Sequence, residues 1–165
     1  MRVAGLLILV KQYQAAEDEA AKKIIVDFYL KNTHYINNWD LVDLSVYKIL
    51  GDFLTSQRVK EYRAVLDKLV ASANLWERRM AIVATFAFIR RGLTKETFRV
   101  AAKLLKDKHD LIHKAVGWML REAGKRQSTA LRGFLDKNHK KMPRTALRYA
   151  IEHFSPADRK YYLLK

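Results

Sequence analysis

LWERRMA at residues 75–81 resembles LIHKAVG at residues 111–117, which lie 36 positions further along the chain. A second similarity relates AVGWML at residues 115–120 to ALRYAI at residues 146–151, at an offset of 31. In each of these segments the apolar residues recur at the three- and four-residue spacing of one helix face. Similarity repeated at this interval indicates that a helical unit recurs along the chain.

Helical periodicity extends from these segments over almost the whole chain, and no segment shows the alternation of a strand. Connections of two to six residues predict that neighbouring helices pack antiparallel. Stacked pairs with this period predict an all-α, HEAT-like or armadillo-type α-solenoid with a concave face lined by one set of helices. An ordinary helical bundle with chance similarity is the alternative. The expected helices are 2–15, 17–31, 38–50, 57–71, 75–91, 95–106, 110–124, 127–139, 143–154 and 157–163.

Short residues between these segments predict where the helices end. A left-handed glycine often follows a helix, and a short polar side chain often caps the first turn. The glycines expected just past helix ends are Gly51, Gly92 and Gly124. The expected N-caps are Asn38, Ser56, Thr94 and Ser155.

The charge of the chain is strongly positive and unevenly distributed. Its 165 residues, which we expect to form one domain over 1–165, include 32 Lys and Arg against 17 Asp and Glu, for a net charge of +15. Residues 1–50 hold six basic and six acidic side chains, so the whole excess lies in residues 51–165. Such a field attracts polyanions, and phosphate neutralisation releases counterions from nucleic acid. The excess predicts a basic concave face that binds DNA or RNA, whereas a merely solvated surface explains it less well.

Several other classes of protein find no support. The chain has no cysteine, and no apolar run approaches the roughly 20 residues that span a bilayer. The apolar start, residues 1–10, resembles a secretory signal only faintly, and we interpret it as a buried helix of a cytoplasmic protein. Neither GxGxxG nor a phosphate loop is present, so no nucleotide cofactor is expected. His109 and His113 have the spacing of a zinc-protease helix, but Asp110 is shorter than the general base of that motif, and we expect no metal site.

Trp39 and Asp43 are the most informative pair of residues in the chain. Four positions apart on a helix that begins near Asn38, they lie one turn from each other on the same face. Arg78 and Trp118 stand on two further helices, and the three helices alternate along the chain, so in a solenoid they line the same side. The sequence predicts that these residues converge in one groove. Taken alone, the tryptophan could be an apolar anchor and the aspartate a solvated acid.

Four segments together resemble the DNA alkylation repair family of HEAT-like DNA glycosylases: INNWDLVDLS at 36–45, LWERRMAIVATFAFIRRG at 75–92, DKHDLIHKAVGWMLREAGK at 107–125 and MPRTALRYAIEHF at 142–154. The resemblance covers essentially the whole chain. It implies excision of cationic N3- and N7-alkylated purines from duplex DNA in base excision repair, with no cofactor. Matching the family pattern assigns the catalytic acid to Asp43, aromatic walls to Trp39 and Trp118, and a DNA-contacting arginine to Arg78.

The chemistry fits these residue types, because cleavage of the glycosidic bond builds positive charge on the sugar that a carboxylate stabilises. A cationic purine leaves without a general acid, so one carboxylate suffices, and tryptophan rings attract the cationic base. We also expect phosphate contacts from four basic residues, Lys114, Arg121, Lys125 and Arg148. Relative to the family, this chain resembles a short member that lacks about one N-terminal helix pair, and we expect it to be a monomer.

Two functions remain open at this point. The first is an alkylpurine DNA glycosylase, which requires Asp43. The second is a non-catalytic HEAT-like module that binds nucleic acid and would be indifferent to the loss of Asp43.

Overall fold

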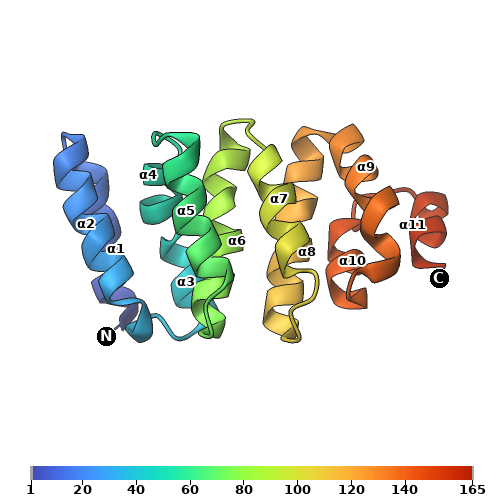
Figure 1. The fold of residues 1–165 in the computed structure, drawn as a ribbon, viewed down its shortest axis with the longest axis horizontal. Helices are drawn as coiled ribbons and strands as arrows, with labels where there is room; N and C mark the ends of the chain where they lie inside the picture. Colours follow the sequence, from blue (N-terminus) through green and yellow to red (C-terminus); the bar gives the residue numbers. More distant parts are fainter. Residues whose placement is uncertain (1, 165) are drawn as a thin grey trace.

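The computed structural model describes residues 2–164, which form helices and no strand. Successive helices run up and down across the molecule from the N-terminal to the C-terminal end (Figure 1). In chain order they are α1 (Arg2–Ala15), α2 (Glu19–Lys31), η1 (Thr33–Tyr35), α3 (Trp39–Ser45), η2 (Tyr47–Gly51), α4 (Asp52–Leu54), α5 (Val59–Val70), α6 (Leu75–Arg90), α7 (Lys95–Leu104), α8 (Asp110–Arg126), α9 (Ser128–Asn138), η3 (His139–Lys141), α10 (Arg144–Ala150) and α11 (Pro156–Leu163).

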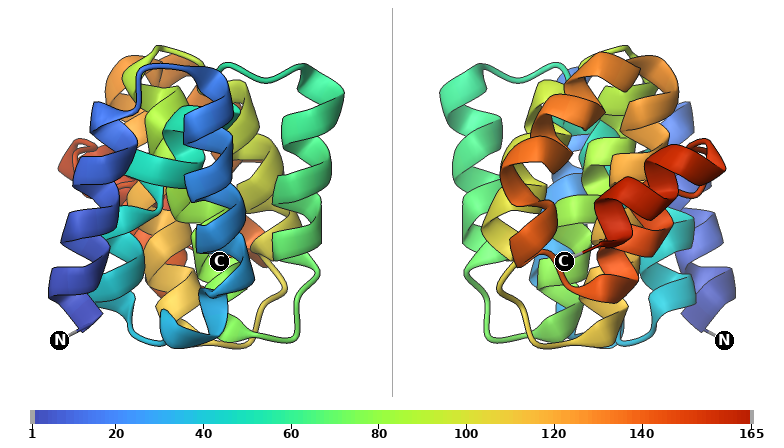
Figure 2. Two further views of the ribbon diagram at one scale, coloured as in Figure 1. Left: turned by 90° about the vertical axis from the view of Figure 1, so that its left-hand side faces the viewer. Right: turned by 90° about the vertical axis from the view of Figure 1, so that its right-hand side faces the viewer.

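Two rows of helices stack along the long axis of the molecule. The first row is α1, the continuous helix α3–η2–α4, α6, α8 and α10, in which each member packs against the next. The second row is α2, α5, α7 and α9, and each of these packs on the first row. In Figure 2, α1 and α11 at the two ends reach further to one side than α3 and α8 between them, so the stack of helices as a whole curves. The predicted all-α solenoid is confirmed.

The core is thickest around α6, in the middle of the first row. Most of this helix is buried, because its neighbours α3–η2, α5, α7 and α8 cover it on nearly every side. Met80, Ile82 and Phe88 are at most 2% exposed. Each large apolar side chain buried in this way contributes roughly 1.5–3 kcal/mol. Helix α6 therefore forms the rigid centre of the solenoid. The side chains at its N-terminal end are attached to this well-packed helix.

Two of the three glycines expected after helix ends lie inside helices instead. Gly51 has right-handed dihedral angles within the helical run that continues through the π-turn η2 to Leu54. A Cβ atom on Gly51 would collide with the carbonyl oxygen of Ala84 on α6. Gly124 lies within α8, where a Cβ atom would collide with Leu131. Both predictions were wrong because these glycines permit close helix packing, whereas Gly92, with φ of 78°, follows α6 as expected.

The capping predictions hold for two of four residues. The Asn38 side chain accepts a hydrogen bond from the amide of the next residue, and Ser155 accepts one from the Asp158 amide. Ser56 instead donates to a backbone carbonyl of the preceding turn, and α5 begins only three residues later. Thr94 directly precedes α7, but its hydroxyl bonds Gln127 on the next repeat and does not cap the helix. Two caps were therefore wrong, because the side chains have other partners.

Helix α1 forms as predicted, but it is not a buried helix. Val10 and Tyr13 are buried, whereas Val3, Leu7 and Ile8 are 43%, 43% and 60% exposed. The reason is that α1 has neighbours on one side only, α2 and α3–η2. No helix within residues 2–164 combines the length and the hydropathy that a membrane span requires.

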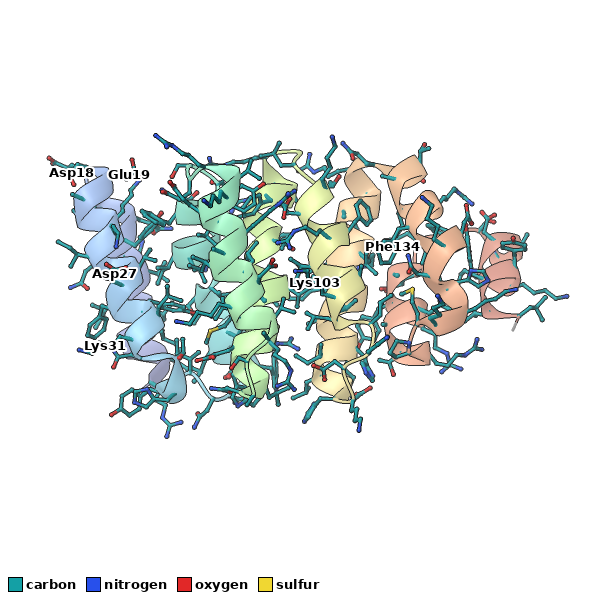
Figure 3. All side chains as sticks on the ribbon, in the orientation of Figure 1. Asp18, Glu19, Asp27, Lys31, Lys103 and Phe134 are labelled. Carbon is teal, nitrogen blue, oxygen red and sulfur yellow. The ribbon has the colours of Figure 1, made fainter. Side chains whose placement is uncertain are left out.

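Ion pairs join two neighbouring helices of the second row, α5 and α7, and Figure 3 labels Lys103 among the side chains of this row. Lys103 on α7 contacts Asp67 on α5 at 2.8 Å. Glu96 is buried between these two helices and accepts hydrogen bonds from Arg63 and from Arg99, the latter at 2.6 Å. Burial opposes ionisation of Glu96, but the bonds from the two arginines outweigh it and lower its pKa. These ion pairs therefore join the repeat that contains α5 to the repeat that contains α7.

Candidate active site

Helix α3 presents Trp39 and Asp43 one turn apart. The chain enters the helix at Asn38, whose extended backbone and side-chain oxygen cap the amide of Trp39 at 2.8 Å. Trp39 is 53% exposed, although tryptophan usually lies mostly covered. Asp43 is partly buried on the same face. A large aromatic surface thus remains open to solvent directly beside a carboxylate.

A buried arginine holds the carboxylate of Asp43 in one orientation. Arg79, at the start of α6, donates from Nε to Oδ1 at 2.9 Å and from a terminal nitrogen to Oδ2 at 2.7 Å. Its other terminal nitrogen donates to the carbonyl oxygen of Leu111 at 2.5 Å. The Arg79 side chain is 6% exposed and that of Asp43 is 17% exposed. Each carboxylate oxygen keeps a second lone pair, so Asp43 can still accept a hydrogen bond from water or polarise a ligand.

Asp43 and Arg79 line a hollow of about 430 Å³ that is formed by helices of the first row. Besides Asp43 and Arg79, its walls are Trp39, Leu111, Lys114, Trp118, Arg121 and Tyr149, from α3, α6, α8 and α10. Trp39 and Trp118 therefore line the same hollow as the carboxylate. The predicted convergence of these two tryptophans with Asp43 is what the structure shows.

The aromatic walls are fixed by packing. Trp118 rests on Phe86 with ring centroids 6.1 Å apart, and Phe86 meets Tyr47 edge-on at 5.2 Å. Tyr149 is placed by Gly117, because α8 and α10 approach so closely that a Cβ atom on Gly117 would lie 2.5 Å from the Tyr149 Cβ atom. The hollow thus has rigid sides supplied by three successive repeats.

Arg78 lies elsewhere, contrary to the predicted convergence. Its Nε donates to Asp107 at 2.6 Å, and a terminal nitrogen donates to the carbonyl oxygens of Ser72 and Ala73 at 3.0 and 2.9 Å. Burial alone would raise the pKa of Asp107, but hydrogen bonds from Arg78 and from the His109 amide lower it. Arg78 therefore joins the loop before α6 to the loop before α8, and Arg79 takes the place beside Asp43.

The four basic residues expected to contact phosphate lie in different surroundings. Lys114 and Arg121 line the hollow, where Lys114 bonds Asp110 at 2.9 Å and Arg121 pairs with Glu152. Lys125 contacts Glu122 at 2.9 Å, one turn beyond the hollow. Arg148 is exposed on α10 and has no ion pair within residues 2–164.

The two histidines near the start of α8 have local partners. His109 caps the helix by accepting from the Leu111 amide at 3.3 Å, and His113 Nε2 lies 2.6 Å from the Asp107 carbonyl oxygen. Among the residues that the structure describes, no group of three His, Cys, Asp or Glu side chains is arranged to hold a metal ion. Both histidine rings therefore stabilise the junction between the loop before α8 and the helix itself.

Sequence reasoning missed Arg79 and Tyr149. The consecutive arginines of α6 lie about 100° apart around the helix, and only one of them can face Asp43. Because α6 is apolar on all sides, its periodicity does not indicate which one. Tyr149 had a detectable signal, since it aligns with Trp118 at the offset of 31 found between residues 115–120 and 146–151.

The fold and the site together define a class: a helical-repeat protein with a carboxylate and two tryptophans in a hollow of its first row. Residues 1–154 match the family model described as DNA alkylation repair enzyme, and the chain belongs to that family. Its role therefore lies in DNA repair. No curated protein matches the sequence.

Proposed function

We propose that the protein is a DNA glycosylase that excises cationic N3- and N7-alkylated purines from duplex DNA. The observation that carries this proposal is the oriented carboxylate of Asp43 in a hollow walled by Trp39 and Trp118. The family to which the chain belongs supports a substrate in alkylated DNA. The tryptophan rings would attract the cationic nucleotide with about 0.5–2 kcal/mol each.

The proposed reaction requires one catalytic group from the protein, the carboxylate of Asp43. The bond between C1′ and the purine nitrogen breaks with its electron pair going to the base, which neutralises the positive charge of the alkylated ring. The sugar becomes an oxocarbenium-like cation, and the negative charge of Asp43 stabilises it. Water then adds to C1′ and loses a proton, which a free lone pair of Asp43 can accept. Arg79 is a positioning residue, because it holds the carboxylate and lies behind it.

Asp43→Asn tests the assignment. We expect release of methylated purine under single-turnover conditions to slow by about 10²-fold or more, because the lost charge acts mainly in the transition state. Binding to duplex DNA should be unchanged or slightly tighter. The variant leaves Arg79 with a neutral partner, so thermal unfolding must show that it is folded at the assay temperature.

Asp40→Asn is the matched control, since it makes the same change on the same helix outside the hollow. It should excise as the parent does. Excision by Asp43→Asn at the parental rate would reject the catalytic role. A parent protein that binds duplex DNA but releases no base would favour the non-catalytic nucleic-acid-binding module.

A further inference from the structure

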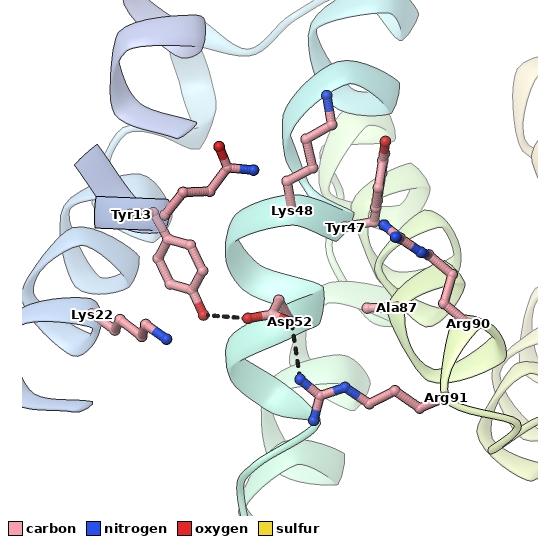
Figure 4. Close-up of a pocket in the computed structure, with 9 residues that line it drawn as sticks. Tyr13, Lys22, Tyr47, Lys48, Asp52, Ala87, Arg90 and Arg91 are labelled. Carbon is pink, nitrogen blue, oxygen red and sulfur yellow. Dashed lines mark hydrogen bonds and ion pairs between the residues drawn. The ribbon is translucent and has the colours of Figure 1, made fainter. Parts of the chain in front are cut away.

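A second hollow of about 430 Å³ lies at the other end of α3–η2–α4, between the end of α1 and the end of α6 (Figure 4). We call it the basic hollow. Four cationic side chains line it, together with a single carboxylate: Lys22, Lys48, Arg90, Arg91 and Asp52. They come from α2, η2, α4, α6 and the residue after α6, so residues distant in sequence meet there.

The one carboxylate in the basic hollow is already occupied. Asp52 accepts from the Tyr13 hydroxyl at 3.0 Å and from Arg91 at 3.0 Å (Figure 4). That bond balances the charge of Arg91. The other three cations, Lys22, Lys48 and Arg90, have no ion pair within residues 2–164. Three unbalanced positive charges around one hollow repel each other, and an anion placed among them would relieve that repulsion.

Aromatic side chains connect the basic hollow to the candidate active site. Tyr47 lies one helical turn after Asp43 and lines the basic hollow. It contacts Phe86, which in turn contacts Trp118 in the wall of the active-site hollow. Arg90 also lines a smaller hollow that reaches Lys125 on α8. The two sites are therefore connected by packed aromatic side chains, and the smaller hollow at Arg90 and Lys125 lies beside them.

The spacing of the two sites suits a DNA strand. Asp43 and Asp52 are separated by nine positions of one helical run, or about 13 Å at the usual rise. B-DNA places a phosphate about every 3.4 Å along its axis on each strand. A strand with a lesion at Asp43 would thus have another of its phosphates close enough to reach the basic hollow.

We infer that the basic hollow binds a backbone phosphate of the duplex whose lesion occupies the candidate active site. This inference rests on the proposed function. Lys22, Lys48 and Arg90 supply the unbalanced charge, and Asp52 limits the total by pairing with Arg91. The site anchors the strand without reading its sequence, since a phosphate has the same form beside every base.

The test is the salt dependence of binding to undamaged duplex DNA by the double variant Lys48→Gln/Arg90→Gln. Its slope of log affinity against log salt should be smaller than the parental slope by about 0.9, because that is the contribution of each neutralised phosphate. Lys60→Gln/Lys137→Gln is the matched control. It removes the same charge from two exposed lysines of the second row and should have a smaller effect on the slope.

Asp52→Asn gives a change of opposite sign. The amide retains a partner for Tyr13 but releases Arg91, so affinity should rise and the slope should become steeper. Weaker binding by Asp52→Asn, or equal slopes for the two double variants, would overturn the inference. Undamaged DNA needs no excision, so these results are independent of whether the parent releases a base.

A free anion is the other source of the same chemistry. Inorganic phosphate titrated into the parent and into Lys48→Gln/Arg90→Gln, followed by NMR, reports on it directly. Competition between phosphate and DNA that disappears in the double variant supports a shared site. Phosphate binding that is lost in the double variant while its DNA slope stays parental would identify a free-anion site and reject the DNA contact.

Discussion

Replacing Arg79 with lysine keeps the positive charge beside Asp43 but removes the geometry that holds it. The guanidinium makes three hydrogen bonds, to both carboxylate oxygens and to the Leu111 carbonyl oxygen. A single ammonium on a flexible stem cannot span these three acceptors at once. The carboxylate then loses its bidentate partner, and we expect it to rotate away from its position in the hollow.

The structural cost of Arg79→Lys follows from the bonds lost. Two hydrogen bonds between charged groups are worth roughly 1.5–3 kcal/mol each, and the contact that the ammonium group of the variant keeps with Asp43 recovers part of this, leaving a loss of about 2–4 kcal/mol. In a protein of this size 1 kcal/mol shifts the melting temperature by about 2–4 °C, so a fall of about 5–15 °C is expected. Misplacing a catalytic group by about 1 Å costs on the order of 10² in rate.

Arg78→Lys is the matched control, because Arg78 also bonds one carboxylate and two backbone acceptors. Both variants should melt at lower temperature by similar amounts. Below both transitions, only Arg79→Lys should release methylated purine slowly in a single turnover. Equal excision by the two folded variants, whether fast or slow, would refute the assignment of Arg79 as the positioning residue.

Two further predictions concern packing and pH. Gly117→Ala should lower the free energy of unfolding by about 1–3 kcal/mol, because the added methyl group collides with α10, and it should displace Tyr149; a urea titration measures the loss, and a parental midpoint would contradict it. Glu96→Gln should cost about 2–4 kcal/mol at neutral pH, where the buried carboxylate pairs with its two arginines, one of them half exposed. Because the folded-state pKa of Glu96 lies below its ordinary value of 4.5, this stabilisation is complete above pH 4.5 and disappears as the pH falls further. Parent and variant should therefore converge in stability in acid, and a difference that persists at low pH would reject the ion pair as its cause.

The sequence was sufficient to predict the helices, since burial against neighbouring repeats requires apolar residues at helical spacing. It was misleading at Gly51 and Gly124, because glycine is selected both for left-handed turns and for close contact between helices. The choice depends on which residue of another helix lies opposite, here Ala84 and Leu131. That information is tertiary, and the local sequence does not contain it.

The repeat itself contains a signal that pairs Asp43 with an arginine at the start of α6. Equivalent positions of neighbouring repeats lie side by side in a solenoid, so partners should be separated by about one period. Three ion pairs in this structure follow that rule: Arg63–Glu96, Arg99–Asp67 and Arg121–Glu152 are separated by 33, 32 and 31 residues. Asp43 and Arg79 are separated by 36, the offset that relates residues 75–81 to residues 111–117. Opposite charges about one repeat apart therefore predict contacts between repeats, and in this chain they predict an arginine of α6 beside the candidate catalytic carboxylate. The choice between Arg78 and Arg79 depends on which of them faces α3, and the structure shows that it is Arg79.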